Sequence, residues 1–234
     1  IANFSGISEL GLFSAASKIP SILITFQGIF IQAWELSALT EYKKEDGAAF
    51  FTKIYNLYNF ALVIGCSFLI MFIKPISSIL LGPEFKEAWR LVPFLLIAVI
   101  FGGIIGFLNT INMAVKKTNA LVIPVIIGAS VGVAINLIFE PKYGAMIASI
   151  SVTISYFLIW FQRLINANKH MKLEVNYLRD ALSYSIILIQ TITVLYLDDN
   201  EISIFAFICF LLLFLINYNT LKDNWFLLKG NIIK

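Results

Sequence analysis

The residues whose types and spacing suit chemistry form one row along the first long apolar segment, residues 11–39. They recur at alternating steps of four and three, and this spacing places them on one face of a helix. Polar and small side chains in an apolar helix, with an ionisable residue toward each end, indicate a face that lines a protein interior or a water-filled cavity. This row, called the polar ridge below, consists of Ser14, Lys18, Ser21, Thr25, Gly28, Gln32 and Glu35.

Two charged residues of the ridge are the sharpest candidates for binding. Lys18 lies roughly 10 Å inside the segment, where a cation can hold an anionic headgroup in a cavity or extend its long stem to the membrane surface. Glu35 lies about 25 Å further along the helix, too far to pair with Lys18. It is either a gating or ion-coupling carboxylate or, as we favour, an interfacial acid beside Lys43 or Lys44.

Amide side chains offer a second set of candidates. Asn109 and Asn112 lie on the small and polar face of a later apolar segment, where they either contact hydroxyl groups of a ligand or bridge helices. Such bridges contribute about 0.6–2 kcal/mol each. Gln32 belongs to the ridge and Gln27 lies off it, so Gln32 is the preferred ligand-facing glutamine.

Charge-free runs alternate with short charged links along the whole chain. The mean hydropathy is +0.87 and 13% of residues are charged, about half the proportion of a soluble domain. Because a spanning helix needs about 20 apolar residues, we expect an all-α polytopic membrane protein with seven spans. Within the fourth span, Gly128 and Gly132 form a GxxxG pattern that predicts close packing of a neighbouring helix. The runs after the first segment are 54–73, 91–115, 118–139, 143–162, 181–197 and 202–221.

Local breaks interrupt this pattern near the chain's start and after the second span. Pro20 predicts a kink close to Ser17. Residues 76–81 form an apolar stretch too short to cross a membrane, so we expect an interfacial helix there. Trp89 follows at the level of the lipid headgroups.

The loop charges predict the orientation. Twelve of the sixteen basic residues in loops follow odd-numbered spans, so the positive-inside rule places those loops and the C-terminus in the cytoplasm and the N-terminus outside. The chain begins outside without an initiator Met or a signal peptide, so we expect the C-terminal part of a longer protein whose missing part holds an odd number of spans.

No pattern in the chain indicates an enzyme. Cys66 and Cys209 both fall inside spans and predict neither a disulfide nor a metal site. Motifs for hydrolysis, phosphoryl transfer and metal catalysis are absent from the sequence. We therefore expect no catalytic residue, no cofactor and no metal.

Four stretches carry motifs of a known family, in order along residues 5–160. They are GLFSAASKIPS at 11–21 with IFIQAW at 29–34, LGPEFKEAWRLVPFL at 81–95, KKT at 116–118, and NLIFEPKYGA at 136–145. Together they resemble the C-terminal half of the polysaccharide (O-antigen and oligosaccharide-lipid) flippases, a family of the multidrug/oligosaccharidyl-lipid/polysaccharide (MOP) exporter superfamily.

The resemblance implies about fourteen helices in two six-helix lobes around a central cavity, followed by two extra helices. Residues 1–165 would form the C-terminal lobe without most of its first helix. Residues 166–180 would be a cytoplasmic link, and residues 181–234 would form two peripheral helices, nearly featureless apart from Gln190, with a short cytoplasmic tail.

The function implied is a flippase of the inner (cytoplasmic) membrane that translocates a lipid-linked oligosaccharide by alternating access, as in lipopolysaccharide O-antigen biosynthesis. Its expected partners are membrane lipids, a polyprenyl-pyrophosphate-linked oligosaccharide and the N-terminal half of the same protein, with no nucleic acid. Lys18 would engage the pyrophosphate. The alternatives are a small-molecule or drug antiporter of the same superfamily, an integral-membrane polysaccharide polymerase or acyltransferase, and a structural assembly subunit.

Overall fold

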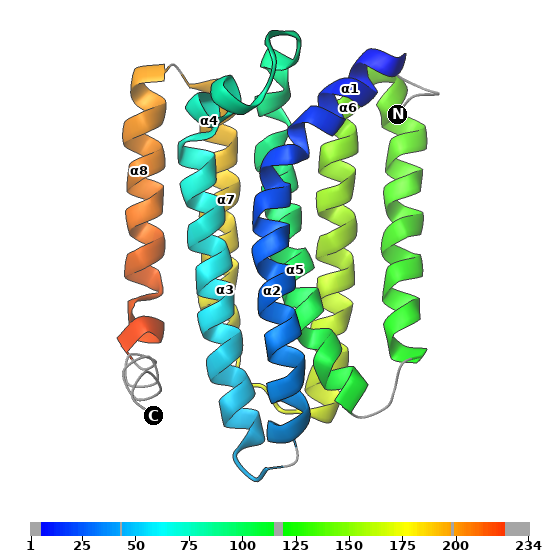
Figure 1. Ribbon diagram of the computed structural model, residues 1–234, viewed down its shortest axis with the longest axis vertical. Helices are drawn as coiled ribbons and strands as arrows, with labels where there is room; N and C mark the ends of the chain where they lie inside the picture. The colour runs from blue at the N-terminus through cyan, green and yellow to red at the C-terminus, as the bar shows by residue number, and fades with distance from the viewer. Residues whose placement is uncertain (1–5, 43, 115–118, 198, 223–234) are drawn as a thin grey trace.

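Helices make up nearly all of the described chain and lie side by side as an elongated bundle (Figure 1). The structure, a computed structural model, describes residues 6–42, 44–114, 119–197 and 199–222. We call the end of the bundle that holds α1 and α4 the upper end, as Figure 1 draws it. The elements are α1 Gly6–Ala16, α2 Lys18–Glu41, α3 Gly47–Met71, α4 Ile73–Leu80, the 3-10 helix η1 Pro83–Arg90, α5 Val92–Ala114, α6 Asn119–His170, α7 Tyr177–Tyr196 and α8 Asp199–Ile216.

Five of the described helices, α2, α3, α5, α6 and α7, are long and apolar enough to cross a membrane. Helix α6 doubles back at Gly144, and its two limbs, 119–143 and 145–170, lie side by side (Figure 1). A hydrogen bond from Ser151 Oγ to Asn136 Oδ1, 2.9 Å long, joins them. Helix α8 contributes a shorter apolar helix, Ile204–Ile216, which is not among these five. The all-α class is confirmed, and the five candidate spanning helices support a membrane protein. The count of seven spans and the lobe of a MOP-type transporter stay predictions.

Helix α5 forms the core of the bundle. Of its most apolar stretch 72% is buried, against 17% for α2, and α2, α3, α6 and α7 all pack against it. Trp34 of α2 stacks on Phe107 of α5, with ring centroids 4.7 Å apart. It also meets Phe51 of α3 edge-on and donates from Nε1 to Thr110 Oγ1 at 3.0 Å. This aromatic cluster attaches α2 to the core through one face.

The kink predicted near Ser17 is confirmed as a break between α1 and α2. Pro20 has no N–H to donate to the carbonyl of Ala16, and its ring crowds that turn. The Ser17 hydroxyl bonds back to Phe13 O at 2.8 Å, which closes the last turn of α1. The break lets α1 lean onto η1 and α6 at the upper end while α2 runs down the bundle.

The reversal of α6 depends on one glycine and one carboxylate. Gly144 has φ +58° and ψ −146°, a conformation that favours glycine. Directly after it, the Ala145 N–H donates to Glu9 Oε2 at 2.7 Å. Glu9 therefore satisfies a free donor at the start of the second limb and ties α1 to that point.

Replacement of Gly144 tests this account of the reversal. Gly144→Ala places a methyl group against the Glu9 carboxylate and imposes an unfavourable φ, so we expect a loss of about 1–3 kcal/mol in stability. Thermal unfolding of the purified chain in detergent measures it. Gly28→Ala, at an exposed helical position with open space around it, is the matched control and should leave stability unchanged or slightly raised. Equal unfolding temperatures for the two variants would contradict the account.

The last two helices carry more buried polar residues than Gln190, the one that the sequence singles out in them. Helix α7 begins at Tyr177, so Arg179 and Asp180 lie within it and are buried. The Arg179 guanidinium donates to Asp180 Oδ1 at 2.6 Å, to Asn56 Oδ1 at 2.8 Å and to Thr220 Oγ1 at 2.7 Å. The helix-free link is accordingly only 171–176, shorter than the predicted 166–180.

Further polar contacts continue this network between α3, α7 and α8. The Tyr55 hydroxyl donates to Asp180 Oδ2 at 3.2 Å. Higher in the bundle, Gln190 accepts a hydrogen bond from Ser67 Oγ at 2.8 Å and donates to the carbonyl of Ala206 at 3.2 Å. Because lipid offers no partners for polar groups, these bonds fix the rotation of α7 and α8 against α3.

Removal of one member of the buried ion pair should be costly. Asp180→Ala leaves the Arg179 guanidinium buried without its carboxylate, and we expect a loss of roughly 3–5 kcal/mol. Thermal unfolding of the purified chain checks this. The control is Glu41→Gln, which breaks the exposed Glu41–Lys44 pair and should cost less than about 1 kcal/mol. Comparable losses of stability in the two variants would show that breaking the buried pair costs no more than breaking the exposed pair.

Candidate functional site

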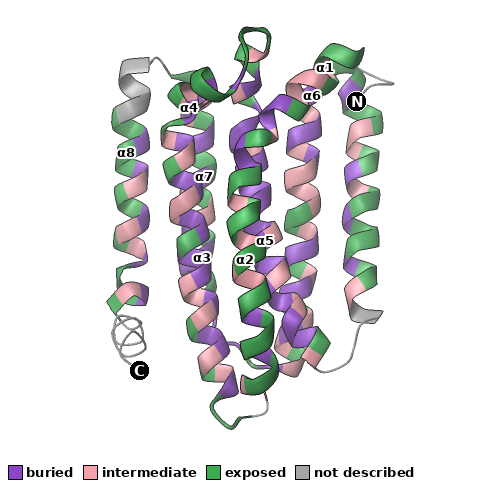
Figure 2. Cartoon of the chain, in the orientation of Figure 1, coloured by how far each residue is buried: buried purple, intermediate pink, exposed green. Residues whose placement is uncertain are grey.

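All seven residues of the polar ridge are exposed in the structure. They lie along α2 and the end of α1, and Figure 2 shows α2 with a largely exposed face toward the viewer. The opposite face of α2, which includes Ile19, Trp34 and Ala38, is buried against the core. The ridge therefore contributes no packing within the described chain and is open to whatever surrounds this part of the molecule.

The exposed side of α2 consists of two strips with different chemistry. At 100° per residue, the ridge occupies one strip. Beside it runs an apolar strip that includes Ile22, Phe26 and Ile29, with exposed fractions of 43%, 66% and 63%. An apolar strip suits lipid, whereas Lys18, with its charge in a spanning helix, needs water or a polar partner. The two strips predict that the helix lies at a boundary between lipid and an aqueous cavity.

Lys18 is the first residue of α2 and carries the cation of the upper ridge. Within the described residues, no carboxylate forms an ion pair with it. The neighbouring hydroxyls point back to the helix, since Ser21 donates to Lys18 O at 2.6 Å and Thr25 donates to Ser21 O at 3.0 Å. Their remaining lone pairs can accept hydrogen bonds from a ligand's hydroxyl groups, while Lys18 can bind an anion.

Glu35 lies at the lower part of the ridge and is exposed. One of the two lysines expected beside it, Lys44, is paired with Glu41 instead, with Nζ and Oε1 2.6 Å apart. The other, Lys43, lies outside the described residues, as does the KKT motif at 116–118. Whether Glu35 acts as a gate or as an interfacial acid stays a prediction.

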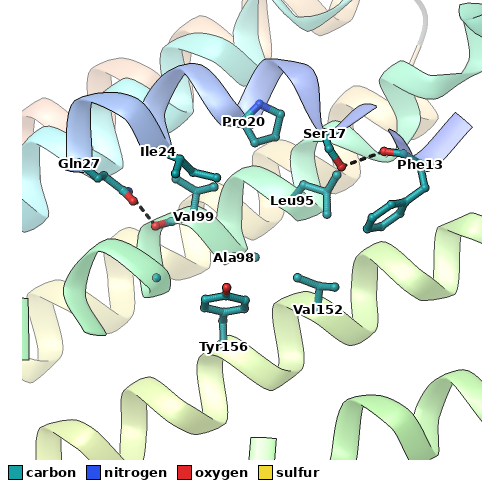
Figure 3. A pocket seen from close by; sticks show the side chains of 11 residues that line it. Phe13, Ser17, Pro20, Ile24, Gln27, Leu95, Ala98, Val99, Val152 and Tyr156 are labelled. Carbon is teal, nitrogen blue, oxygen red and sulfur yellow. Dashed lines mark hydrogen bonds between the residues drawn. The ribbon is translucent and has the colours of Figure 1, made fainter. Parts of the chain in front are cut away.

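Next to the ridge, a groove opens between α1, α2, α5 and the second limb of α6 (Figure 3). Its volume is about 350 Å³, and none of its lining residues belongs to the ridge. Most of the lining is apolar, including Leu95, Ala98 and Val152. The groove thus offers a hydrocarbon-like surface alongside a polar one.

Three polar side chains mark the groove. Gln27 donates from Nε2 to Val99 O at 2.9 Å, so it bridges α2 to α5, as its position off the ridge predicts. Ser17 is bonded to Phe13, and the Tyr156 hydroxyl lies at the groove opposite α2 (Figure 3). The sequence does not predict Tyr156 as a residue of the groove, because a single tyrosine in an apolar span belongs to no periodic pattern.

The remaining predicted residues divide between surface and interior. Asn112 is fully buried, where its Nδ2 donates to Leu108 O at 3.4 Å, and Asn109 is half-buried. The side-chain oxygens of both have no hydrogen-bond partner within the described part of the chain. Neither residue reaches the exposed ridge, and their binding roles stay predictions.

The two glycines of the fourth span lie where the limbs of α6 meet. A methyl group on Gly128 would collide with Ile159, and one on Gly132 would collide with the Ser155 hydroxyl. Both positions are buried. The close helix packing that the GxxxG pattern predicts is present, and its partner is the second limb of the same hairpin.

Comparisons with known proteins assign no family. No family model, characterised protein or solved structure matches the chain.

Cysteine labelling distinguishes the two strips of α2. Single cysteines at ridge positions such as Ser21, Thr25 and Gln32 should react with a membrane-impermeant maleimide in intact membranes, because a cavity supplies the water that forms thiolate. Cysteines at Phe26 and Ile29, equally exposed in the isolated chain, should not react, because lipid covers them. Uniform labelling of both strips, or of neither, would contradict a boundary along this helix.

The background of this labelling experiment is low. The native Cys66 and Cys209 are both free and buried. The unmodified chain is the matched control, and full reaction after detergent solubilisation and denaturation shows that each introduced thiol is competent.

Proposed function

We propose that this chain is the C-terminal part of a flippase for a lipid-linked oligosaccharide. The observation that carries the proposal is the exposed polar ridge of α2 beside an apolar groove. A polyprenyl-pyrophosphate-linked oligosaccharide has the same division, with a hydrocarbon tail, an anionic headgroup and many hydroxyls. The resemblance of residues 5–160 to polysaccharide flippases supports the same assignment.

Each part of the substrate has a matching surface. Lys18 would bind the pyrophosphate, and exposed hydroxyl and amide groups such as Ser21, Thr25 and Gln32 would meet the sugar. The apolar groove would take the first part of the isoprenoid chain, since it is lined mainly by aliphatic and aromatic residues. The cation and the hydrocarbon surface lie on adjacent sides of one helix, so one substrate can contact both.

Transport would proceed by alternating access. This lobe would rock against an N-terminal lobe of the same protein about a site near the membrane midplane, in the inner membrane, with the upper end of the bundle outside and the C-terminus in the cytoplasm. An uncovered ridge suits half of such a cavity, because the other half would supply the facing wall. The chain alone would then be inactive in transport.

A second candidate is a small-molecule antiporter of the same superfamily. The groove favours it, since a largely apolar cavity of about 350 Å³ is within the size range of drug-like sites, roughly 300–1,000 Å³. The ridge favours the flippase, because a long polar face suits an extended, hydroxyl-rich substrate. Resistance profiles of cells that lack the gene distinguish the two functions.

Replacement of Lys18 in the full-length protein tests the proposal. Lys18→Ala should reduce surface polysaccharide about tenfold or more at unchanged protein level, because a charge-assisted contact to the headgroup contributes about 1.5–3 kcal/mol. Lys18→Arg should restore part of the export, since the guanidinium keeps the charge.

The matched control is Lys142→Ala, which removes an exposed lysine that is not part of the ridge, two residues before the reversal of α6 at Gly144. Its export should equal that of the unchanged protein. Normal export by Lys18→Ala would exclude the headgroup role. An equal loss of export in both variants would show that the effect comes from the total positive charge at this end of the bundle and not from Lys18 itself.

A further inference from the structure

A second cavity lies at the upper end of the bundle, between α4 and η1, apart from the ridge and its groove. Its volume is about 440 Å³. Three cations line it, Lys74 from α4 and Lys86 and Arg90 from η1, together with a single carboxylate, Glu87. The charge bias of the loops leaves this end of the bundle with only four basic loop residues. Three of those four line this one pocket, which membrane topology alone does not predict.

The cations are held in place around one aromatic ring. Lys74 Nζ lies 5.0 Å from the centre of the Trp89 ring, and the Arg90 guanidinium lies 5.6 Å from it. Arg90 also bonds through Nε to Glu87 Oε2 at 2.8 Å. Lys86 is exposed and forms no ion pair with the carboxylates of the described residues. The lining therefore holds more cations than carboxylates, kept close together by η1 and the ring.

The same pocket is lined by a buried hydroxyl group that lacks a hydrogen-bond partner. Ser77 lines the cavity, is only 5% exposed, and its Oγ has no hydrogen-bond partner within the described chain. A buried hydroxyl without a partner costs about 1–3 kcal/mol. A ligand oxygen in the pocket would accept this hydrogen bond, so the unpaired group is a second and independent sign of a bound anion.

The surroundings of the pocket indicate where that anion comes from. Helix α4 has two sides: Lys74 and Ser77 face the pocket, while Ile79 and Leu80 are 81% and 48% exposed. Phe72, just before α4, is 40% exposed. A short helix with one bare apolar side, next to a tryptophan at the end of a membrane bundle, lies at the level of the lipid headgroups.

We infer that the pocket between α4 and η1 binds the phosphate group of an anionic membrane lipid. Lys86 and Arg90 bind the phosphate oxygens, Lys74 adds charge from the other side, and Ser77 donates its free hydrogen bond. The acyl chains extend along Ile79 and Leu80 into the bilayer. Basic pockets at helix ends recognise lipid headgroups by this combination of charge and position.

Lipid titration of the purified chain, followed by native mass spectrometry, tests the assignment. We expect phosphatidylglycerol to bind more tightly than phosphatidylcholine at the tightest site. The double variant Lys86→Gln/Arg90→Gln should bind phosphatidylglycerol roughly thirtyfold more weakly, because each near-surface cation contributes about 1 kcal/mol. Both replaced side chains are exposed, so the fold should be kept.

Ser77→Ala separates binding from structure. It should weaken phosphatidylglycerol binding by about threefold to tenfold while leaving the unfolding temperature of the lipid-free chain unchanged or raised, since it removes an unpaired hydroxyl. A lowered unfolding temperature without lipid, with no change in lipid binding, would show that Ser77 is structural and overturn its part in the site.

Lys142→Gln is the matched control, because Lys142 also lies over an aromatic ring, Tyr143, at 5.2 Å and is exposed at the upper end. It should leave lipid binding unchanged. Equal binding of the two lipids, or no loss in the double variant, would overturn the proposal. Complete displacement of phosphatidylglycerol by equimolar inorganic phosphate would assign the pocket to soluble phosphate and overturn the lipid assignment.

Discussion

The structure depends on one constraint: inside an apolar bundle, each polar group must find its partner within the protein or in water that the protein admits. Between α3, α7 and α8 the constraint is met internally, because the Arg179 guanidinium uses donors on three sides and Asp180 accepts from Tyr55. On α2 the Ser21 and Thr25 hydroxyls bond to their own helix, but Lys18 has no carboxylate partner within the described residues, and the ridge points outward. The same rule therefore accounts for rigid attachment at one side of the bundle and for an open, polar helix at the other.

The two groups of cations near the upper end differ in their position along the bundle and in the residues beside them. Lys18 projects from a spanning helix with no carboxylate of the described chain paired to it, and hydroxyls beside it are bonded to their own backbone. The cations around Trp89 belong to an interfacial helix and a 3-10 turn, with Glu87 among them. A deep, isolated charge suits a ligand that enters and leaves, whereas a shallow cluster suits one that remains at the membrane surface.

Local sequence patterns predicted the helices well because charge-free runs and prolines act locally. The break at Ser17, the short helix α4 and the packing of Gly128 and Gly132 all follow from residues within a few turns of each other. The α7 network escaped prediction because its partners, such as Tyr55 and Asp180, are 125 residues apart in the sequence. The groove could not be predicted either, since its apolar lining residues have the same sequence pattern as a lipid-facing surface. Periodicity placed Asn109 and Asn112 on one face, but only the neighbouring helices decide that Asn112 is enclosed.

Helix α2 separates recognition from folding. Its buried face, anchored by the Trp34 cluster, provides the attachment to α5, and the ridge residues provide none of it. Replacements along the ridge are therefore nearly free of stability cost, while replacements on the opposite, buried face are not. A lineage that carries this helix can exchange one polar side chain for another, and so change what it recognises, without first acquiring compensating mutations in the core.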